Sequence, residues 1–352
     1  PRKTGFLSRV KVQKNHNEDV AGDKKAVYFF IWSGENFPYL YRMAVESVLL
    51  NVPNANVVIY VVGRPPQTRH FQELSQLQRV AVCHLNPADL FKLLPQNLGH
   101  VANVYRDLPS SSVAAQSNIL RYCILFLYGG VYLDFDTFTL KPIHELKKSD
   151  TVVGEELVWR GDEARVAGSK YVYLHFTTWA WALSWVGRRL DARYFQGKLQ
   201  LAKRWKVTEG FWGKYQANNA VMVASAGTAF IERVLVGLKG TRNDVRYSTG
   251  PTLISKMISE DDSDVEVRRS THFYSIPPGE SFRFFEDHSL ELSNEVAVIH
   301  YVGSNHAELL QVVTPSLLAL NPQSVIGRIA RDIEARRKTL YPTSSASRLA
   351  NS

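Results

Sequence analysis

Residues 115–141, AQSNILRYCILFLYGGVYLDFDTFTLK, join a helical pattern to a short strand that ends in two carboxylates. Apolar residues recur there at the three- and four-residue spacing of a helix: Ile119, Leu120, Cys123, Ile124 and Leu127. Gly129-Gly130 should end this helix, because glycine takes the left-handed C′ conformation without a Cβ clash. Val131–Leu133 then predicts a short buried strand, with Asp134 and Asp136 directly after it. Since α/β proteins bind ligands at the carboxyl ends of their strands, the two aspartates predict a functional site.

The N-terminal part of the chain predicts the beginning of a parallel sheet. Apolar, strand-forming runs occur at 27–32, 57–62 and 80–84, and a helical pattern lies at 38–50. Strand, helix and strand at this spacing are typical of a βαβ unit. We therefore expect an α/β fold, with a Rossmann-like sheet flanked by helices.

The pattern after Pro142 is looser. Strands are predicted at 151–156, 217–225, 272–274 and 296–300, and helices at 228–238 and from Thr252 onward. Glu155 and Glu156 are expected at the end of the first of these strands, where they would stabilise a cationic centre or would form a solvated loop pair.

We predict one main domain at 25–312, which contains a helical insertion at 177–215. The insertion carries five tryptophans: Trp179, Trp181, Trp185, Trp205 and Trp212. Their rings would fill a core or would form an acceptor platform, because aromatic faces pack against sugar rings. Outside the domain we expect a polar basic tail at 1–24, a basic amphipathic helix at 313–342 and a flexible tail at 343–352.

The composition is that of an ordinary globular protein with a basic surface. Apolar residues make up 45% of the chain and charged residues 21%, with a formal net charge of +9. Such a charge favours anionic partners, namely nucleotide phosphates, acidic lipid or nucleic acid, or it is simply solvated. No nucleic-acid motif is recognisable, so no nucleic acid is expected. The C-terminal basic helix would dock on an anionic membrane or pack, solvated, on the domain.

Two cysteines, Cys83 and Cys123, exclude a disulfide scaffold and fit a reducing compartment. Polar residues interrupt the most apolar run, 171–186, which makes it a poor membrane span. No signal peptide is recognisable, although the chain begins at Pro1, as a trimmed N-terminus would. We expect a cytoplasmic or membrane-associated bacterial protein, with a secreted effector or the Golgi lumen as alternatives.

Asp134-Phe135-Asp136 places two carboxylates on one short segment. Such a pair suits a hard divalent cation that also holds phosphate oxygens. Many surface loops contain the same pattern as a structural turn, so its meaning depends on the buried strand and the glycine-terminated helix before it.

These residues resemble the sugar-binding region of retaining glycosyltransferases that contain a DXD motif. The family includes Golgi α-galactosyl- and mannosyltransferases, bacterial capsule enzymes and, more distantly, the glucosyltransferase domains of large clostridial toxins. The similar segments run in order along most of the chain: Phe30–Gly34, Ser117–Tyr122, Tyr128–Asp136, Asn218–Ser225, Ser248–Pro251 and Ile299–Ser304. The resemblance implies a GT-A type nucleotide-sugar-binding fold, with a Rossmann-like mixed sheet flanked by helices.

The resemblance also implies roles for individual residues. Asp136, with Asp134 and His300, would bind Mn²⁺ or Mg²⁺ at the donor's diphosphate. Asp134 would also contact the ribose and the donor sugar. Arg121 would hydrogen-bond the donor sugar, and Trp32 would stack on the nucleobase. Alternatively, Arg121 would only pair with a carboxylate, and His300 and Trp32 would only fill the core. The remaining donor-site residues are Asn118, Asn219 and Gly250.

Asn118 departs from the family, since many relatives carry Asp at this position. An amide still hydrogen-bonds sugar hydroxyls but adds no charge, so the preferred donor sugar stays open. The predicted catalytic residues are Asp134, Asp136, Arg121 and Glu155.

The function predicted from the sequence is a metal-dependent retaining hexosyltransferase. It would move a hexose from a nucleotide-sugar, UDP-linked before GDP-mannose, to a hydroxyl of a glycan, glycolipid or protein. A divalent cation and a nearby cationic side chain stabilise the diphosphate charge that grows as the glycosidic bond breaks. The alternatives are a bacterial effector that glycosylates protein and, in a different class, a non-catalytic sugar- or nucleic-acid-binding module.

Overall fold

The computed structural model describes residues 26–144, 149–161, 169–241 and 247–341. The tails predicted at 1–24 and 343–352 lie outside these residues. Within the described part of the chain, no helix is both long and apolar enough to cross a bilayer.

The first half of the fold is the predicted parallel βαβ arrangement. Strands β1 (Val27–Ser33), β2 (Asn56–Val62) and β3 (Val80–His84) pair in parallel. Helices α2 (Tyr39–Asn51) and α3 (Arg69–Ser75) connect them. Buried aliphatic and aromatic side chains of β1 and β2 pack on α2, so the periodicity of the sequence is confirmed here.

Helix α6 (Val113–Tyr128) and strand β4 (Gly130–Leu133) form the centre of the molecule. Gly129 and Gly130 between them have φ values of +67° and +111°. A Cβ atom on Gly129 would lie 2.8 Å from the amide nitrogen of Ala226, and one on Gly130 would lie 2.9 Å from the carbonyl oxygen of Val27. Both the backbone conformation and the close packing therefore require glycine.

The main sheet has seven strands in the order β3-β2-β1-β4-β7-β6-β8. Its second half consists of β6 (Thr151–Trp159), β7 (Gly213–Ala224) and β8 (Val265–Arg268). Since β7 runs antiparallel to both β4 and β6, the sheet is mixed, as predicted. A second sheet pairs β5 (Thr137–Thr139) with β9 (Val298–His300) in antiparallel orientation.

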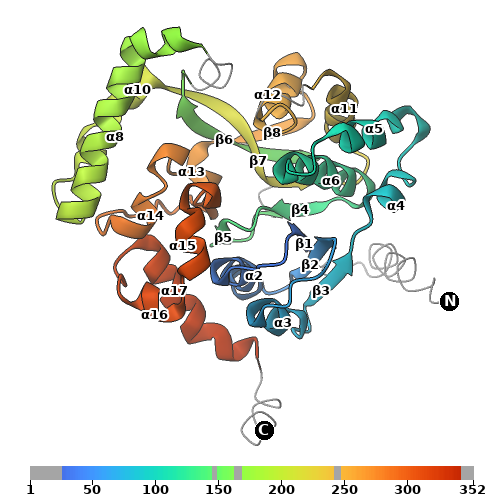
Figure 1. Ribbon diagram of the computed structural model, residues 1–352, viewed down its shortest axis with the longest axis horizontal. Coiled ribbons are helices and arrows are strands. Elements are labelled where there is room, and N and C mark those ends of the chain that lie inside the picture. The colour runs from blue at the N-terminus through green and yellow to red at the C-terminus, as the bar shows by residue number, and fades with distance from the viewer. Residues whose placement is uncertain (1–25, 145–148, 162–168, 242–246, 342–352) are drawn as a thin grey trace, which may run out of the picture.

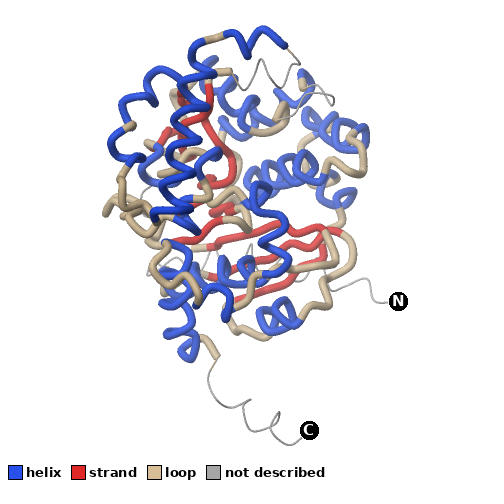
Figure 2. The backbone as a smooth tube through the Cα atoms, turned by 60° about the vertical axis from the view of Figure 1, so that its left-hand side comes forward, coloured by secondary structure: helices blue, strands red, loops and turns tan. Residues whose placement is uncertain are grey.

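Helices cover both faces of the main sheet, which Figure 2 shows as a layer of strands between them. One face carries α6 with α4 (Pro87–Phe91), α5 (His100–Asp107), α11 (Ala229–Gly237) and α12 (Pro251–Glu260). The other face carries α2 and α3 (Figure 1). Short helices complete this part of the chain: η1 (Gln96–Leu98), η5 (Leu238–Gly240) and α13 (Ser270–Phe273).

The C-terminal part packs beside α2 and β5. It contains η6 (Pro278–Glu280), α14 (Arg283–Glu286), η7 (Gly303–His306), α15 (Ala307–Val312), α16 (Pro315–Ala319), α17 (Val325–Arg336) and η8 (Arg337–Thr339). The single basic helix predicted over this stretch is wrong, because Pro322 lacks the amide that a continuous helix needs. Helix α17 begins directly after Ser324, whose hydroxyl caps the helix by accepting a hydrogen bond from the Gly327 amide at 3.1 Å.

Two other predictions of secondary structure are wrong in detail. Residues 272–274 were expected as a strand but belong to the short helix α13 and its end. Three apolar residues do not distinguish a buried helix from a strand, and here Phe273 and Tyr274 fill the core. Strand β6 continues past the predicted end at Glu156 to Trp159, and its pairing with β7 shifts register between Val153 and Gly154.

The helical insertion is present but ends at Trp212, directly before β7 begins at Gly213. It consists of η3 (Lys170–Leu174), α8 (Phe176–Phe195), α9 (Leu201–Arg204), η4 (Lys206–Thr208) and α10 (Glu209–Trp212). Figure 1 shows α8 along the outer edge of the molecule, away from the helices that cover the sheet.

Candidate active site

The two aspartates lie where the direction of the sheet changes. β4 pairs in parallel with β1 on one side and antiparallel with β7 on the other. The chain leaves β4 at Asp134, whose amide donates to the carbonyl of Ala220 at 2.8 Å, and Asp136 follows before β5. This is the carboxyl end of a central strand, the position at which α/β sheets bind ligands.

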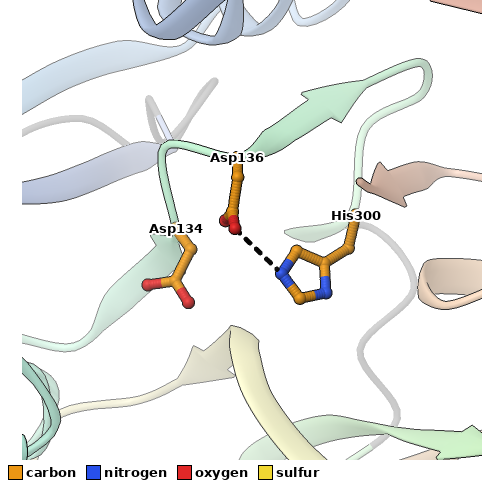
Figure 3. A group of neighbouring side chains, drawn as sticks. All are labelled: Asp134, Asp136 and His300. Atoms are coloured by element: carbon orange, nitrogen blue, oxygen red, sulfur yellow. Dashed lines mark ion pairs between the residues drawn. The ribbon is translucent and has the colours of Figure 1, made fainter. Parts of the chain in front are cut away.

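His300 reaches Asp136 because β5 and β9 pair. The register places Thr137 opposite His300, so the two residues are neighbours although they are far apart in the sequence. His300 Nε2 lies 3.4 Å from an Asp136 carboxylate oxygen (Figure 3). The Gly303 amide donates to the same oxygen at 2.6 Å, which fixes the side chain of Asp136.

The charges at this site are strongly coupled. Burial disfavours the charged form of His300, but Asp136 and Glu156 outweigh this effect and raise the pKa of His300 well above its ordinary value. Burial alone would raise the pKa of Asp136, but His300 and the Gly303 amide lower it. The pKa of Asp134 is raised by burial and by Asp136, despite the favourable charge of Arg121. Two adjacent carboxylates thus lie where a bound cation would stabilise their charged forms.

Arg121 lies on α6, and its guanidinium points toward Asp134. Its Nη2 atom lies 3.0 Å from an oxygen of Asp134, and its Nη1 atom donates to the carbonyl of Asn219 at 2.6 Å. The guanidinium also lies over the ring of Tyr132, 4.1 Å from its centroid, and the Tyr132 hydroxyl donates to Asp134. This side chain is therefore held rigidly beside Asp134 and does pair with a carboxylate, as the alternative from the sequence suggested.

The three residues Asp134, Asp136 and His300 fit a divalent cation. Each offers one ligand atom, and these atoms all lie within 4.8 Å of one another. Two carboxylates and one imidazole leave coordination positions for a ligand's oxygens, and the imidazole favours Mn²⁺ over the harder Mg²⁺. Nδ1 of His300 is buried and makes no hydrogen bond to any of the described residues, although an oxygen of Glu156 lies 3.7 Å away.

A cavity of about 1140 Å³ opens beside these residues. Asp134, Asp136 and His300 lie in its wall, together with Arg121 and Asn118. A smaller cavity of about 350 Å³ adjoins it at the carboxyl ends of β1 and β2 and shares Arg121 and both aspartates. Ligand pockets are commonly about 300–1,000 Å³, so the two cavities together have room for a nucleotide and more than one sugar.

The predicted donor-site residues on α6 and β7 form one hydrogen-bonded group. Asn219 donates to Asn118 at 3.0 Å and to the Tyr122 hydroxyl at 2.7 Å, and Asn118 donates to Thr249 at 3.3 Å. Gly250 lies outside the cavity wall, but a Cβ atom there would lie 2.8 Å from the side-chain amide nitrogen of Asn118. Glycine at this position therefore leaves room for Asn118 rather than contacting the cavity itself.

Trp32 lines the smaller cavity, at the end of β1. Its ring is half-buried and packs edge-on against Phe37, Tyr41 and Phe135, whose centroids lie 5.3–5.6 Å from that of Trp32. The indole nitrogen donates to the Gly34 carbonyl at 3.0 Å. This position is compatible with the stacking on a nucleobase that we expect, and that role stays a prediction.

Glu155 does not line the cavity, whereas its neighbour Glu156 does. Successive side chains of a strand point to opposite faces, and both residues lie within β6 instead of at its end. The Glu156 carboxylate is buried and accepts from Asn218 at 2.6 Å, and its other oxygen has no hydrogen-bond partner in the part of the chain that the structure describes. The pairing of β6 with β7 shifts register beside Gly154, where a Cβ atom would lie 2.6 Å from the Tyr274 ring.

Three further residues of the site were not predicted. Tyr122 and Asn218 hold predicted residues in place, and Gly303 binds Asp136 through its amide. All three lie within segments that resemble the family, so the sequence did contain a signal for them. Their contacts depend on strands that pair only in the folded chain.

The fold and the site together define an α/β protein with a partly buried carboxylate-imidazole cluster in the wall of a large cavity. Residues 42–156 match the family described as the glycosyltransferase sugar-binding region containing a DXD motif. The predicted resemblance to this family is therefore confirmed over this part of the chain. The matched residues include Arg121, Asp134, Asp136 and Glu156, whereas His300 lies beyond them.

Similar proteins include an initiation-specific alpha-1,6-mannosyltransferase of Candida albicans. It is 38% identical over 74 residues, which cover 21% of this chain but only 18% of that protein. Among solved structures, the galactosyltransferase LgtC in complex with donor and acceptor sugar analogs has a TM-score of 0.41 and 13% identity, covering 92% of this chain and 99% of that one. The PaToxG glycosyltransferase has a TM-score of 0.39 and 14% identity, covering 73% and 78%. Because these TM-scores are low, the function proposed below rests on the sugar-binding region and the site.

Proposed function

We propose that this glycosyltransferase transfers a hexose from a nucleotide-sugar to a hydroxyl acceptor, with retention of configuration and with a divalent cation, Mn²⁺ before Mg²⁺. The observation that carries this proposal is the convergence of Asp134, Asp136 and His300 at the cavity. A cation held there would neutralise the diphosphate charge that grows as the glycosidic bond breaks.

The protein's own residues supply binding and orientation. The smaller cavity, with Trp32 at its rim, would hold the nucleoside, and its modest volume favours a uridine over a larger purine. Arg121, fixed by Asp134 and the Asn219 carbonyl, would donate to the sugar or to the diphosphate. Asn118 and Asn219, which lie beside Arg121 on α6 and β7, would position the sugar's hydroxyls.

Retention requires either a carboxylate on the far face of the sugar or a front-face path assisted by the leaving phosphate. Glu156 supplies a carboxylate of the kind that the first route needs. It is buried in the cavity wall, and one of its oxygens makes no hydrogen bond among the described residues. We assign it the stabilisation of the positive charge that develops on the sugar ring. This role replaces the one predicted for Glu155.

The test is donor hydrolysis and transfer with UDP- and GDP-sugars, with and without Mn²⁺, followed by NMR of the anomer released. We expect slow, Mn²⁺-dependent hydrolysis of a UDP-hexose, lost on chelation and in Asp136→Ala. Asp262→Ala, which removes an exposed carboxylate, is the matched control and should remain active. Binding of the donor without any turnover would instead indicate a non-catalytic sugar-binding module. An inverted product would contradict the retaining mechanism while leaving the transferase activity intact.

A further inference from the structure

Helix α8 has an unusual distribution of side chains. One side of it exposes a stripe of large apolar residues at three- and four-residue spacing: Phe176, Trp179, Leu183, Val186, Leu190 and Tyr194. Trp179, Leu183 and Tyr194 are 62%, 67% and 69% exposed. The side that packs on the protein instead buries polar residues: Thr177, Thr178, Ser184, Arg188 and Asp191. A helix of a soluble domain normally has the opposite arrangement, so the stripe needs a partner.

The apolar surface continues into the segments on either side of α8. Tyr171 and Leu174 precede it with exposed fractions of 82% and 80%, and Val207 and Phe211 follow it. The ring of Phe211 contacts that of Phe176, with centroids 6.3 Å apart, so α10 extends the surface at one end of α8. Tryptophan and tyrosine are enriched in this surface, as they are at the interface between a bilayer and water.

The charges around the stripe are positive. Residues 169–215 contain nine lysines and arginines but only two acidic residues, Asp191 and Glu209. Both acidic groups are used internally: Asp191 accepts from the amides of Leu199 and Leu201, and Glu209 pairs with the buried Arg188. The exposed charges are therefore basic: Lys170, Arg193, Lys198, Lys203, Arg204 and Lys206.

We propose that the outer side of α8 with its flanking basic residues docks this protein on an anionic lipid surface. An apolar stripe rich in aromatic residues, beside lysine and arginine, is complementary to the acyl boundary and to acidic headgroups at the same time. A protein partner or a second copy of the chain would bury the stripe but would not explain the surrounding positive charge. The C-terminal helix is the weaker candidate, because Arg336 and Arg337 already bind Asn51 and Glu46 on α2.

The opposite side of α8 connects this surface to the candidate active site. Trp181 lines the large cavity and stacks on Trp159, with centroids 5.0 Å apart, and Thr178 lies in the same wall. One helix, about 10–12 Å across, thus separates the lipid surface from the cavity. Resting on the function proposed above, the acceptor is then an amphiphile whose hydroxyl or sugar headgroup projects from the bilayer.

Sedimentation with vesicles tests the docking without any need for activity. The protein should bind vesicles of phosphatidylcholine and phosphatidylserine, bind pure phosphatidylcholine weakly, and lose binding in high salt. Leu183→Ser with Leu190→Ser should weaken binding at least about tenfold. Val312→Ser with Leu320→Ser, which removes two exposed apolar side chains near the C-terminus, is the matched control and should bind normally.

Activity is measured in a separate assay, so that a failure of lipid docking and a failure of the proposed transferase activity give different results. The Leu183→Ser and Leu190→Ser variant should hydrolyse the soluble donor like the original protein but should use a vesicle-embedded acceptor poorly. Absence of donor hydrolysis would contradict the transferase while the vesicle result stands. Full recovery of the protein in the supernatant, or a dimer that the two serines convert to a monomer, would overturn the lipid surface.

Discussion

The guanidinium of Arg121 and the carboxylate of Asp134 form an ion pair 3.0 Å long at the carboxyl end of the central strand. Arg121 is 4% exposed, whereas Asp134 is 29% exposed and opens into the cavity. The arginine thus has a fixed position, and the aspartate keeps one side available to a ligand.

Replacing Arg121 with Met should destabilise the protein, because it leaves Asp134 and the Asn219 carbonyl without their partner. Water in the cavity reaches Asp134, so we expect a loss of about 2–3 kcal/mol rather than the larger cost of a fully buried pair. Urea unfolding measures this change. Arg69→Met is the control, since Arg69 is 86% exposed and its pair with Glu73 should contribute at most about 1 kcal/mol. Equal losses in both variants would contradict a structural role for the Arg121 pair.

Replacing His300 with Asp should change the preferred metal. An all-carboxylate site suits the harder Mg²⁺, whereas the imidazole favours Mn²⁺. The thermal shift caused by Mn²⁺ should therefore shrink relative to that caused by Mg²⁺, measured at saturating donor. His84→Asp, on the exposed end of β3, controls for added negative charge. An unchanged ratio of the two shifts would exclude His300 as a ligand.

Replacing Glu156 with Gln should slow turnover without weakening the binding of the donor. The amide keeps the shape of the side chain but not the charge that faces the cavity, and the loss of one such group costs about 10²–10³-fold in kcat. Single-turnover kinetics and donor titration separate the two effects. Glu155→Gln, which changes the neighbour outside the cavity, should behave like the original protein. A larger effect at Glu155 would contradict the orientation of β6.

Stability should fall with acid through His306. Burial, followed by the nearby Arg189, lowers the pKa of His306 from 6.5 to about 4, although Asp136 opposes this shift. Between these values the unfolded chain binds more protons than the folded protein, so stability rises with pH across this window. The contribution is complete above 6.5 and is lost as the pH falls toward 4. Nε2 of His306 lies 2.9 Å from the Ser281 hydroxyl, and its ring lies 4.5 Å from that of Phe285.

Denaturant unfolding at several pH values checks this prediction. His306→Gln should flatten the slope of stability against pH between about 4 and 6.5, whereas His84→Gln at an exposed position should not. An unchanged slope in the His306 variant would assign the acid sensitivity to other groups.

The sequence alone determined the local elements that carry the site. Periodic apolar residues predicted α6 and β4, and the glycine pair between them has the positive φ angles that its position requires. The aspartates follow the strand as expected, because strand ends are set by short-range pattern. The resemblance then joined these residues to the later segment that contains His300.

Only the tertiary structure decided which side chains meet. His300 faces Asp136 because β5 and β9 pair, and Glu156 replaces Glu155 because the alternation of side chains along β6 turns Glu156 toward the cavity. Strand pairing is a long-range choice that local pattern does not encode, and a shift of one residue reverses every side chain. For a related reason, the sequence did not predict that the apolar stripe of α8 faces outward. Periodicity in a sequence identifies two sides of a helix, but only packing decides which of them the protein buries.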